Sequence, residues 1–378
     1  MRHRSTPSPQ LFSNLSRRQI LRSGLLGWVG LGLSQGMTGC GWRLGNVRQT
    51  LSRTAQKDLL VYTWAQYVDD ELLRAFQQMS HIPTQSEVFD ANETMFAALQ
   101  AGKGGNFSIL YPSEYFIPKL VEAGIIEPLD YSRLTNLNSL MPQFRPKPDD
   151  RDHHYGIPFS WGTTGVIYNS DKIPNGFEDW DALWSLKEKL TRKVTLLSDS
   201  REVIGMALKS LGYSLNEENP DRIRQAYEKL TKLKPHLASF TTDGWKSRIA
   251  AGDLWAAMCY SSDAKPLIKA NPKLRYTVPK PGAALWSDWV VIPKAAPNPD
   301  AAYQWINYLL QDEVAASLAL RLSVTTPNAN AIKRLPPEIQ NSPVSYPSQD
   351  ILDRCEAMKA LKPETEVVLD KYWNQLIS

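Results

Sequence analysis

Residues 59–76, which read LLVYTWAQYVDDELLRAF, decide the fold of this chain. The apolar run from Leu59 to Tyr62 is short enough for a buried strand. Leu72 and Phe76 follow at the spacing of one face of a helix. The acidic run Asp69–Glu71 stands at the start of that helix, where the helix dipole favours negative charge. The segment therefore predicts a strand, a tight connection and a helix, the opening unit of an α/β fold.

Two aromatic rings, Trp64 and Tyr67, stand on the predicted connection. In open α/β sheets, ligands bind just beyond the carboxyl ends of the strands, and this connection is such a place. Aromatic side chains also pack frequently into cores, so the same rings could serve as core anchors. The segment alone leaves both interpretations open.

Residues 1–39 have the composition of an export signal. They contain five arginines and no Asp, Glu or Lys, and Ser16–Leu21 (SRRQIL) reads as a twin-arginine signal. The weakly apolar stretch that follows is too short for a membrane-spanning helix. It ends at Cys40 in a pattern that resembles a lipoprotein cleavage site, so we expect Cys40 to be lipidated. The alternative is cleavage elsewhere, with Cys40 incidental. Residues 40–57 are polar and predict a tether.

Removal of this leader changes the charge balance. The chain of 378 residues has 43 basic and 39 acidic side chains, and the leader holds five of the basic ones, leaving 38. A nearly neutral remainder gives no support for nucleic-acid binding. Its length exceeds what one core usually serves, which predicts two lobes. Cys259 and Cys355 could pair outside the cytoplasm, but two cysteines make no disulfide framework.

Strands and helices alternate along the rest of the chain, which indicates an α/β fold with a largely parallel sheet. The strand over Trp161–Tyr168 carries glycines that suit a crossing between lobes. Asp90–Glu93 has the spacing of a capping box at a helix start. The other predicted strands are Thr84–Phe89, Ser108–Tyr111, Val194–Leu197, Trp255–Tyr260, Leu274–Val278 and Trp289–Ile292. Helices are predicted over about 116–123, 300–320 with a break near 311, and 364–376.

Aromatic and carboxylate side chains recur beside the predicted strand ends. They include Trp64, Tyr67, Tyr115, Asp199, Glu202, Tyr260, Asp263, Trp286 and Asp288. Together they suggest a site for a long organic cation, because carboxylates pair with ammonium groups and rings pack on methylenes. Asp199 and Glu202 could instead form a capping box. Asp263 could be a first-turn helix carboxylate that needs no ligand.

The motifs of common enzymes and metal sites do not match. Gly102–Gly105 lacks the spacing of a phosphate-binding loop, and no nucleophile elbow occurs. His153 and His154 are adjacent in a polar loop, which favours a solvated loop over a zinc site. We therefore expect no metal, no cofactor and no enzymatic activity.

Seven segments between about Leu59 and the C-terminus carry a resemblance to a known family. They are Tyr62–Tyr67, Asn92–Met95, Pro112–Tyr115, Ile157–Gly162, Asp199–Val203, Trp286–Asp288 and Thr326–Asn328. In this order they resemble the periplasmic spermidine/putrescine-binding proteins of polyamine ABC transporters. The resemblance implies a two-lobe, type II periplasmic-binding-protein fold with a two-strand hinge and a ligand cleft between the lobes. We expect residues 58–166 and 287–332 in lobe 1, and residues 167–286 and 333–378 in lobe 2.

The resemblance also implies which side chains line the cleft. One side would carry Trp64, Gln66, Tyr67, Ser113 and Tyr115; the other Asp199, Glu202 and Tyr260; and the crossing Trp286 and Asp288. Asp263 falls where putrescine-preferring relatives place a carboxylate. Val324 and Met358 stand where spermidine binders tend to carry a tyrosine and a glutamine, so the preferred polyamine stays open.

By this resemblance, the protein would capture spermidine or putrescine by lobe closure. We expect an exported, periplasmic monomer that contacts the membrane through its lipid alone and delivers its ligand to a permease with a separate ATPase. Two alternatives stay open. The ligand could be another cation such as ferric iron, or the chain could be a secreted glycoside hydrolase. Asp199 and Glu202, one helical turn apart on one lobe, are poorly placed to flank a glycosidic bond.

Overall fold

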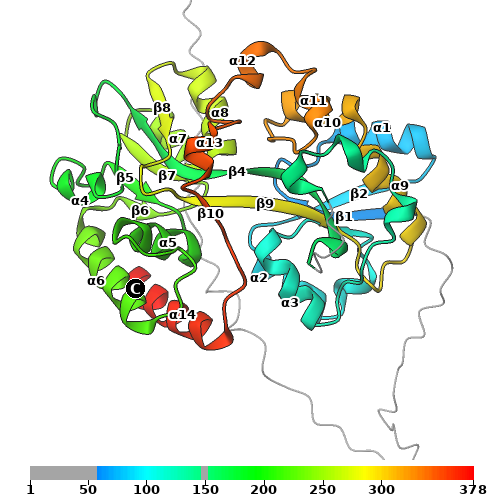
Figure 1. Ribbon diagram of the computed structural model, residues 1–378, viewed down its shortest axis with the longest axis horizontal. Coiled ribbons are helices and arrows are strands. Elements are labelled where there is room, and N and C mark those ends of the chain that lie inside the picture. The colour runs from blue at the N-terminus through cyan, green and yellow to red at the C-terminus, as the bar shows by residue number, and fades with distance from the viewer. Residues whose placement is uncertain (1–57, 146–151) are drawn as a thin grey trace, which may run out of the picture. The chain divides into compact units, whose positions relative to one another are not determined.

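The computed structural model describes residues 58–145 and 152–378. The predicted export signal, the lipidation site Cys40 and the tether 40–57 lie outside the described residues. All described residues belong to one unit, Arg53–Ser378. Within this unit, two α/β lobes lie on either side of two long strands (Figure 1). The model confirms the predicted two-lobe α/β fold.

The two long strands are β4 (Gly156–Asn169) and β9 (Ala284–Val291), which run antiparallel to each other. The first half of β4 pairs with β9, and its second half continues into lobe 2 and pairs with β7 (Ala256–Tyr260). This arrangement is the expected two-strand hinge. The strand predicted over Trp289–Ile292 begins earlier, at Ala284. Residues 284–288 extend β9 because β4 supplies hydrogen-bonding partners along them.

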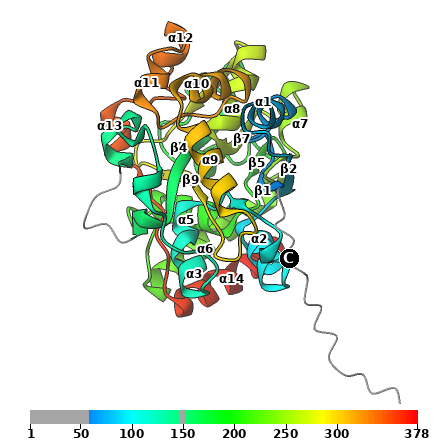
Figure 2. The same ribbon diagram turned by 90° about the vertical axis from the view of Figure 1, so that its right-hand side faces the viewer.

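Lobe 1 contains the strand order β2-β1-β3-β9. Strand β1 lies parallel to β2 and β3, whereas β3 is antiparallel to β9. Helices cover this sheet (Figure 2). The strands are β1 (Leu59–Trp64), β2 (Thr84–Phe89) and β3 (Ile109–Leu110), and the α-helices are α1 (Asp70–Ser80), α2 (Asn92–Gln100), α3 (Ile117–Glu122), α9 (Pro299–Leu309) and α10 (Asp312–Arg321).

The predicted start of α1 is confirmed by its local contacts. Asp69 is the N-cap, and its carboxylate accepts a hydrogen bond from the backbone N–H of Leu72 at 2.8 Å. Leu72 and Phe76 are buried on the inner face of the helix. Asp69 also pairs with Arg321 at 2.6 Å, which ties the start of α1 to the end of α10.

Lobe 2 contains the strand order β4-β7-β5-β6, with β8 on the other side of β4. Strand β5 is parallel to both β6 and β7. The further strands are β5 (Val194–Leu196), β6 (Ser239–Phe240) and β8 (Leu274–Thr277), and the α-helices are α4 (Ala182–Ser185), α5 (Ser200–Ser210), α6 (Pro220–Leu233), α7 (Lys246–Ala250) and α8 (Ser261–Ala270).

The C-terminal part of the chain contacts both lobes. Leu335 and Tyr346 pack against α10 of lobe 1, whereas strand β10 (Glu356–Ala357) pairs with β9 and helix α14 (Pro363–Ile377) packs on α5 and α6. The division at residue 332 therefore stays a prediction. The short helices in between are α11 (Ala329–Ile332), α12 (Pro337–Gln340) and α13 (Gln349–Leu352).

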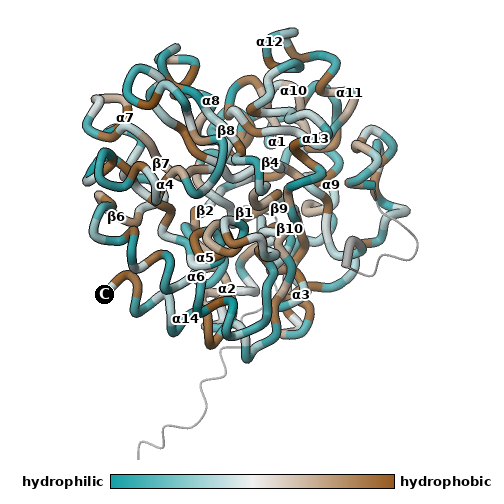
Figure 3. Tube along the Cα trace, turned by 60° about the vertical axis from the view of Figure 1, so that its left-hand side comes forward, coloured by the Kyte–Doolittle hydropathy of each residue, from teal (hydrophilic) through white to brown (hydrophobic). Residues whose placement is uncertain are grey.

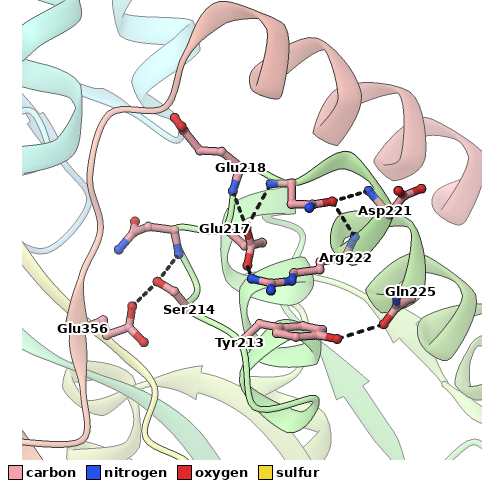
Figure 4. Close-up of polar contacts among 10 residues, drawn as sticks. Tyr213, Ser214, Glu217, Glu218, Asp221, Arg222, Gln225 and Glu356 are labelled. Atoms are coloured by element: carbon pink, nitrogen blue, oxygen red, sulfur yellow. Dashed lines mark hydrogen bonds and ion pairs between the residues drawn. The ribbon is translucent and has the colours of Figure 1, made fainter.

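A polar loop before α6 fastens this C-terminal segment to lobe 2 (Figure 4). Ser214 donates a hydrogen bond to Glu356 on β10. The carboxylate of Glu217 accepts from Arg222 at 2.8 Å and from the backbone of Asn219 at 2.9 Å. Asn219 in turn caps α6.

Hydropathy alternates along α6 and α14, as expected for helices with one buried face (Figure 3).

One local prediction is corrected, and one open pairing is decided. The capping box at Asp90–Glu93 is wrong, because Ala91 is the N-cap of α2 and no side chain caps it. Cys259 and Cys355 are free thiols, so the pairing considered from the sequence is not formed. Among the helices described, none combines the length and apolar character needed to cross a membrane.

Candidate functional site

A cavity of about 490 Å³ lies between the two lobes, within the size range of small-molecule sites. All eleven side chains predicted from the sequence line it: Trp64, Gln66, Tyr67, Ser113, Tyr115, Asp199, Glu202, Tyr260, Asp263, Trp286 and Asp288. The described lining is strongly acidic and has a single basic side chain, Lys246. Its carboxyl groups belong to Asp90, Glu93, Glu114, Asp199, Glu202, Asp243, Asp263 and Asp288.

The topology explains why residues so distant in sequence meet. Trp64 ends β1 and Tyr67 follows it, while Asp199 follows β5 and Asp263 follows β7. The carboxyl ends of these strands face the cavity from the two lobes, as the rule for open α/β sheets predicts. Gln66 has a φ of 68°, which lets the chain turn sharply between the two rings.

Asp288 on β9 is held by two hydroxyl groups of lobe 1. The Tyr67 hydroxyl donates to its Oδ2 at 2.5 Å, and Ser113 Oγ donates to its Oδ1 at 2.7 Å. Burial raises the pKa of Asp288 to about 6, although both hydrogen bonds oppose the increase. Asp288 is therefore ionised at neutral pH, whereas the Tyr67 and Ser113 hydroxyl groups that donate to it are neutral.

Asp199 and Glu202 form a second buried acidic pair at the start of α5. Asp199 caps the helix by accepting from the backbone N–H of Glu202 at 3.0 Å, so the capping interpretation of Asp199 is confirmed while the same side chain lines the cavity. Glu202 instead accepts from Thr164 Oγ1 at 2.9 Å. Burial and then the charge of Asp199 raise the pKa of Glu202 to about 8. Burial likewise raises the pKa of Asp199.

The aromatic side chains flank these carboxylates. Trp64, Tyr115, Tyr260 and Trp286 are half-buried, whereas Tyr67 is buried. The rings of Tyr260 and Trp286 lie 5.8 Å apart in an edge-to-face arrangement. Trp64 also packs on Phe89, with the ring centroids 4.5 Å apart. The Tyr67 ring is buried, and its hydroxyl group donates a hydrogen bond to Asp288. The core-anchor interpretation and the site interpretation therefore both describe this residue.

Several cavity side chains were missed in the sequence. Asn92 orients two predicted ones, since its amide donates to Ser113 Oγ and to the Tyr115 hydroxyl, each at 3.2 Å. Its spacing was assigned to the incorrect capping box. Lys246 pairs with Asp263 at 2.7 Å and with Asp243 at 2.8 Å. Asp243 and Lys246 follow strand β6, which has only two residues and therefore gives no hydrophobic pattern from which a strand could be predicted.

The two departures from the family pattern lie in different places. Met358 lines the cavity and packs near Tyr115, whereas Val324 lies in the lobe 1 core and is absent from the described lining. Within residues 58–145 and 152–378, no cluster of three or more His, Cys, Asp or Glu has the geometry to hold a metal ion.

Two further contacts join side chains of the two lobes. Lys119 on α3 approaches Glu366 on α14 at 3.7 Å, and the guanidinium of Arg201 lies 5.5 Å from the Tyr115 ring. Arg201 further donates to the backbone carbonyl of Lys359 at 3.0 Å. The Lys119–Glu366 ion pair and the contact of Arg201 with Tyr115 therefore join the two lobes.

Comparisons with known proteins agree with this architecture. Residues 71–345 match the family described as bacterial extracellular solute-binding protein. The spermidine/putrescine-binding periplasmic protein of Salmonella typhimurium is 34% identical over 319 residues, covering 84% of this chain and 91% of the relative. The putrescine/cadaverine-binding protein of Pseudomonas aeruginosa is 30% identical over 334 residues, covering 85% and 94%.

A solved structure extends the likeness to three dimensions. The spermidine/putrescine ABC transporter substrate-binding protein of Streptococcus pneumoniae superposes with a TM-score of 0.75 at 33% identity. The match covers 85% of this chain and 98% of that one. Sequence, fold and cavity position thus agree: the chain belongs to the bacterial extracellular solute-binding protein family.

Proposed function

We propose that this protein captures a small polyamine in the cavity between its lobes and delivers it to an ABC importer without changing it chemically. The observation that carries this proposal is the cavity lining. Eight carboxyl groups and several aromatic rings surround one basic side chain among the described residues. An aliphatic chain with ammonium groups matches both features, since the ammonium groups pair with carboxylates and the methylenes pack on rings.

The roles of individual side chains follow from their contacts. Asp288 would pair with one ammonium group, because it is buried, ionised at neutral pH and bonded to two neutral hydroxyl groups. Asp199 and Glu202 would receive a second ammonium group, which would stabilise their ionised forms. Trp64, Tyr115, Tyr260 and Trp286 would pack along the chain between them, with Ser113 and Gln66 completing the wall.

Closure of the lobes couples capture to delivery. A ligand that touches both lobes stabilises the closed form by its difference in affinity for the two forms. Tyr67 and Asp199 belong to different lobes and line the same cavity, so one ligand can contact both. The permease with its ATPase would then receive the closed form. The arginine pair and Cys40 support export to the periplasm and attachment by lipid. We propose that the exported protein acts as a monomer.

Calorimetric titration tests the proposal directly. Putrescine, cadaverine and spermidine are titrated into the purified protein, with ferric citrate and an aryl glycoside as comparison compounds. We expect saturable binding of at least one polyamine at a stoichiometry near one. Asp288→Asn should weaken it strongly, whereas Asp300→Asn, at an exposed pair with Arg133, should not. Absence of polyamine binding, or turnover of the glycoside, would contradict the proposal.

A further inference from the structure

Lys246 brings a positive charge of the protein itself into the acidic cavity. Its ammonium group lies 2.7 Å from Asp263 and 2.8 Å from Asp243, and these are ion pairs with direct contact. The side chain of Asp263 is 15% exposed, and that of Lys246 is 27% exposed. Burial lowers the pKa of Lys246, but the two carboxylates more than compensate, so the ammonium group stays charged.

The carboxylates of the cavity are therefore not equivalent. Asp288, Asp199 and Glu202 accept hydrogen bonds from hydroxyl or backbone N–H groups in the described structure. Asp263 alone of the predicted carboxylates already has a lysine as its partner. A ligand ammonium group can pair with the first three without displacing a charge. At Asp263 it would meet the ammonium group of Lys246.

The carboxylates of the cavity are carried by different elements. Asp199 and Glu202 stand at the start of α5, whereas Asp263 stands in the first turn of α8, where Lys246 of α7 pairs with it. Asp288 lies on β9 and accepts hydrogen bonds from Tyr67 and Ser113 of lobe 1. A ligand with ammonium groups at Asp288 and at the Asp199–Glu202 end is complete without Asp263. The remaining predicted carboxylate for a third ammonium group is Asp263, which Lys246 already occupies.

We propose, resting on the polyamine function above, that Lys246 occupies the Asp263 end of the cavity as a resident ammonium group and selects diamines over longer triamines. Like charges brought together without water between them repel each other, so a triamine whose third amine reaches Asp263 must displace Lys246 or leave that amine unpaired. A diamine makes its pairs at the other end and has no such cost. Asp263 then acts on ligand choice through Lys246, by holding its ammonium group in place.

The test compares putrescine and spermidine binding to four proteins by calorimetry at one ionic strength. The variants are Lys246→Met, Lys246→Met/Asp263→Asn and the control Lys273→Met. Lys273 pairs with the exposed Asp171 on the surface at 2.6 Å, so the control removes a paired lysine of equal charge outside the cavity. Thermal melting of each variant confirms that it is folded.

We expect the wild type to bind putrescine more tightly than spermidine. Lys246→Met frees Asp263, and the spermidine-to-putrescine affinity ratio should rise about tenfold to a hundredfold, the gain of one charge-assisted pair. The double variant should lose most of that gain, and Lys273→Met should keep the wild-type ratio. A wild type that prefers spermidine tenfold, or an unchanged ratio in Lys246→Met, overturns the inference while polyamine binding itself stands. Failure of the wild type to bind any polyamine overturns the proposed function instead.

Discussion

The buried carboxyl group of Glu202 should make polyamine binding release a proton. Its pKa is raised to about 8 by burial and by the charge of Asp199. At pH 7 a carboxyl group with that pKa is protonated in roughly nine of ten molecules. An ammonium group beside it favours the ionised form, so binding expels the proton.

The size of the effect on affinity follows from the same pKa. If the ligand binds only ionised Glu202, affinity rises with pH until the pH passes the pKa. Between pH 6 and pH 8 the rise is roughly fiftyfold. Ionisation of Asp288, whose pKa is about 6, raises the affinity by only about a further factor of two, near pH 6. The terminal amines of the ligand resemble a lysine ammonium group, whose pKa is about 10, and stay charged over this range.

The stability of the unliganded protein should change in the opposite direction. The folded-state pKa of Glu202 lies above the unfolded value of about 4.5, so the folded state binds more protons between these values. The contribution of Glu202 to stability is therefore lost as the pH rises toward 8. Glu202→Gln keeps the size of the side chain and a hydrogen-bond acceptor for Thr164, and it should remove both pH dependences.

Calorimetry in buffers of different ionisation enthalpy measures the protons released. We expect close to one proton at pH 7 for the wild type and a release near zero for Glu202→Gln. Glu218→Gln is the matched control, because Glu218 pairs with Lys362 on the surface and does not line the cavity. Equal proton release by the wild type and Glu202→Gln would refute the reasoning, as would a release near zero in the wild type.

Three further predictions concern the aromatic rings, Asp288 and the lipid anchor. Trp64→Ala should weaken polyamine binding and leave the melting temperature of the free protein nearly unchanged, whereas Trp161→Ala in the core should cost about 3–5 kcal/mol of unfolding free energy; a large loss of stability with intact binding in Trp64→Ala would instead indicate a core role. Asp288→Asn should weaken putrescine and spermidine alike, by about 2–5 kcal/mol in calorimetric titration; a loss restricted to one ligand would contradict a shared subsite. Cys40→Ala should shift the protein from the membrane fraction to the soluble periplasm; unchanged fractionation would exclude lipidation at this residue.

The sequence predicts those parts of the fold whose pattern is local. Strand β2 runs over Thr84–Phe89 as expected, and Gln311 separates α9 from α10 at the expected break. The first half of β9 was missed because its hydrogen-bonding partner, β4, lies more than a hundred residues away in sequence. The capping box predicted at the start of α2 was also wrong. Asn92 instead accepts a hydrogen bond from the backbone N–H of Ser113, a contact that spacing along the chain does not show.

The candidate site was predictable where side chains follow strands. The rule that ligands bind at the carboxyl ends of strands places Trp64, Asp199 and Asp263 at one cavity, and the model brings them together. Lys246 was not predictable in this way. It stands after a strand of two residues, and its role depends on a pairing with Asp263 that spacing along the chain does not show.

The pairing of β3 with β9 has a consequence for the order in which the protein folds. Leu110 pairs with Val291, so β3 lacks one neighbour until β9 is synthesised, after the strands β5 and β7 of lobe 2. Lobe 2 can pair β5 with β7 before β9 exists. Because contacts between distant residues close slowly, lobe 1 should be the later lobe to complete, although its chain begins first. The wall containing Met358 and Trp373 is added after both, so the binding cavity is the last feature of the protein to form.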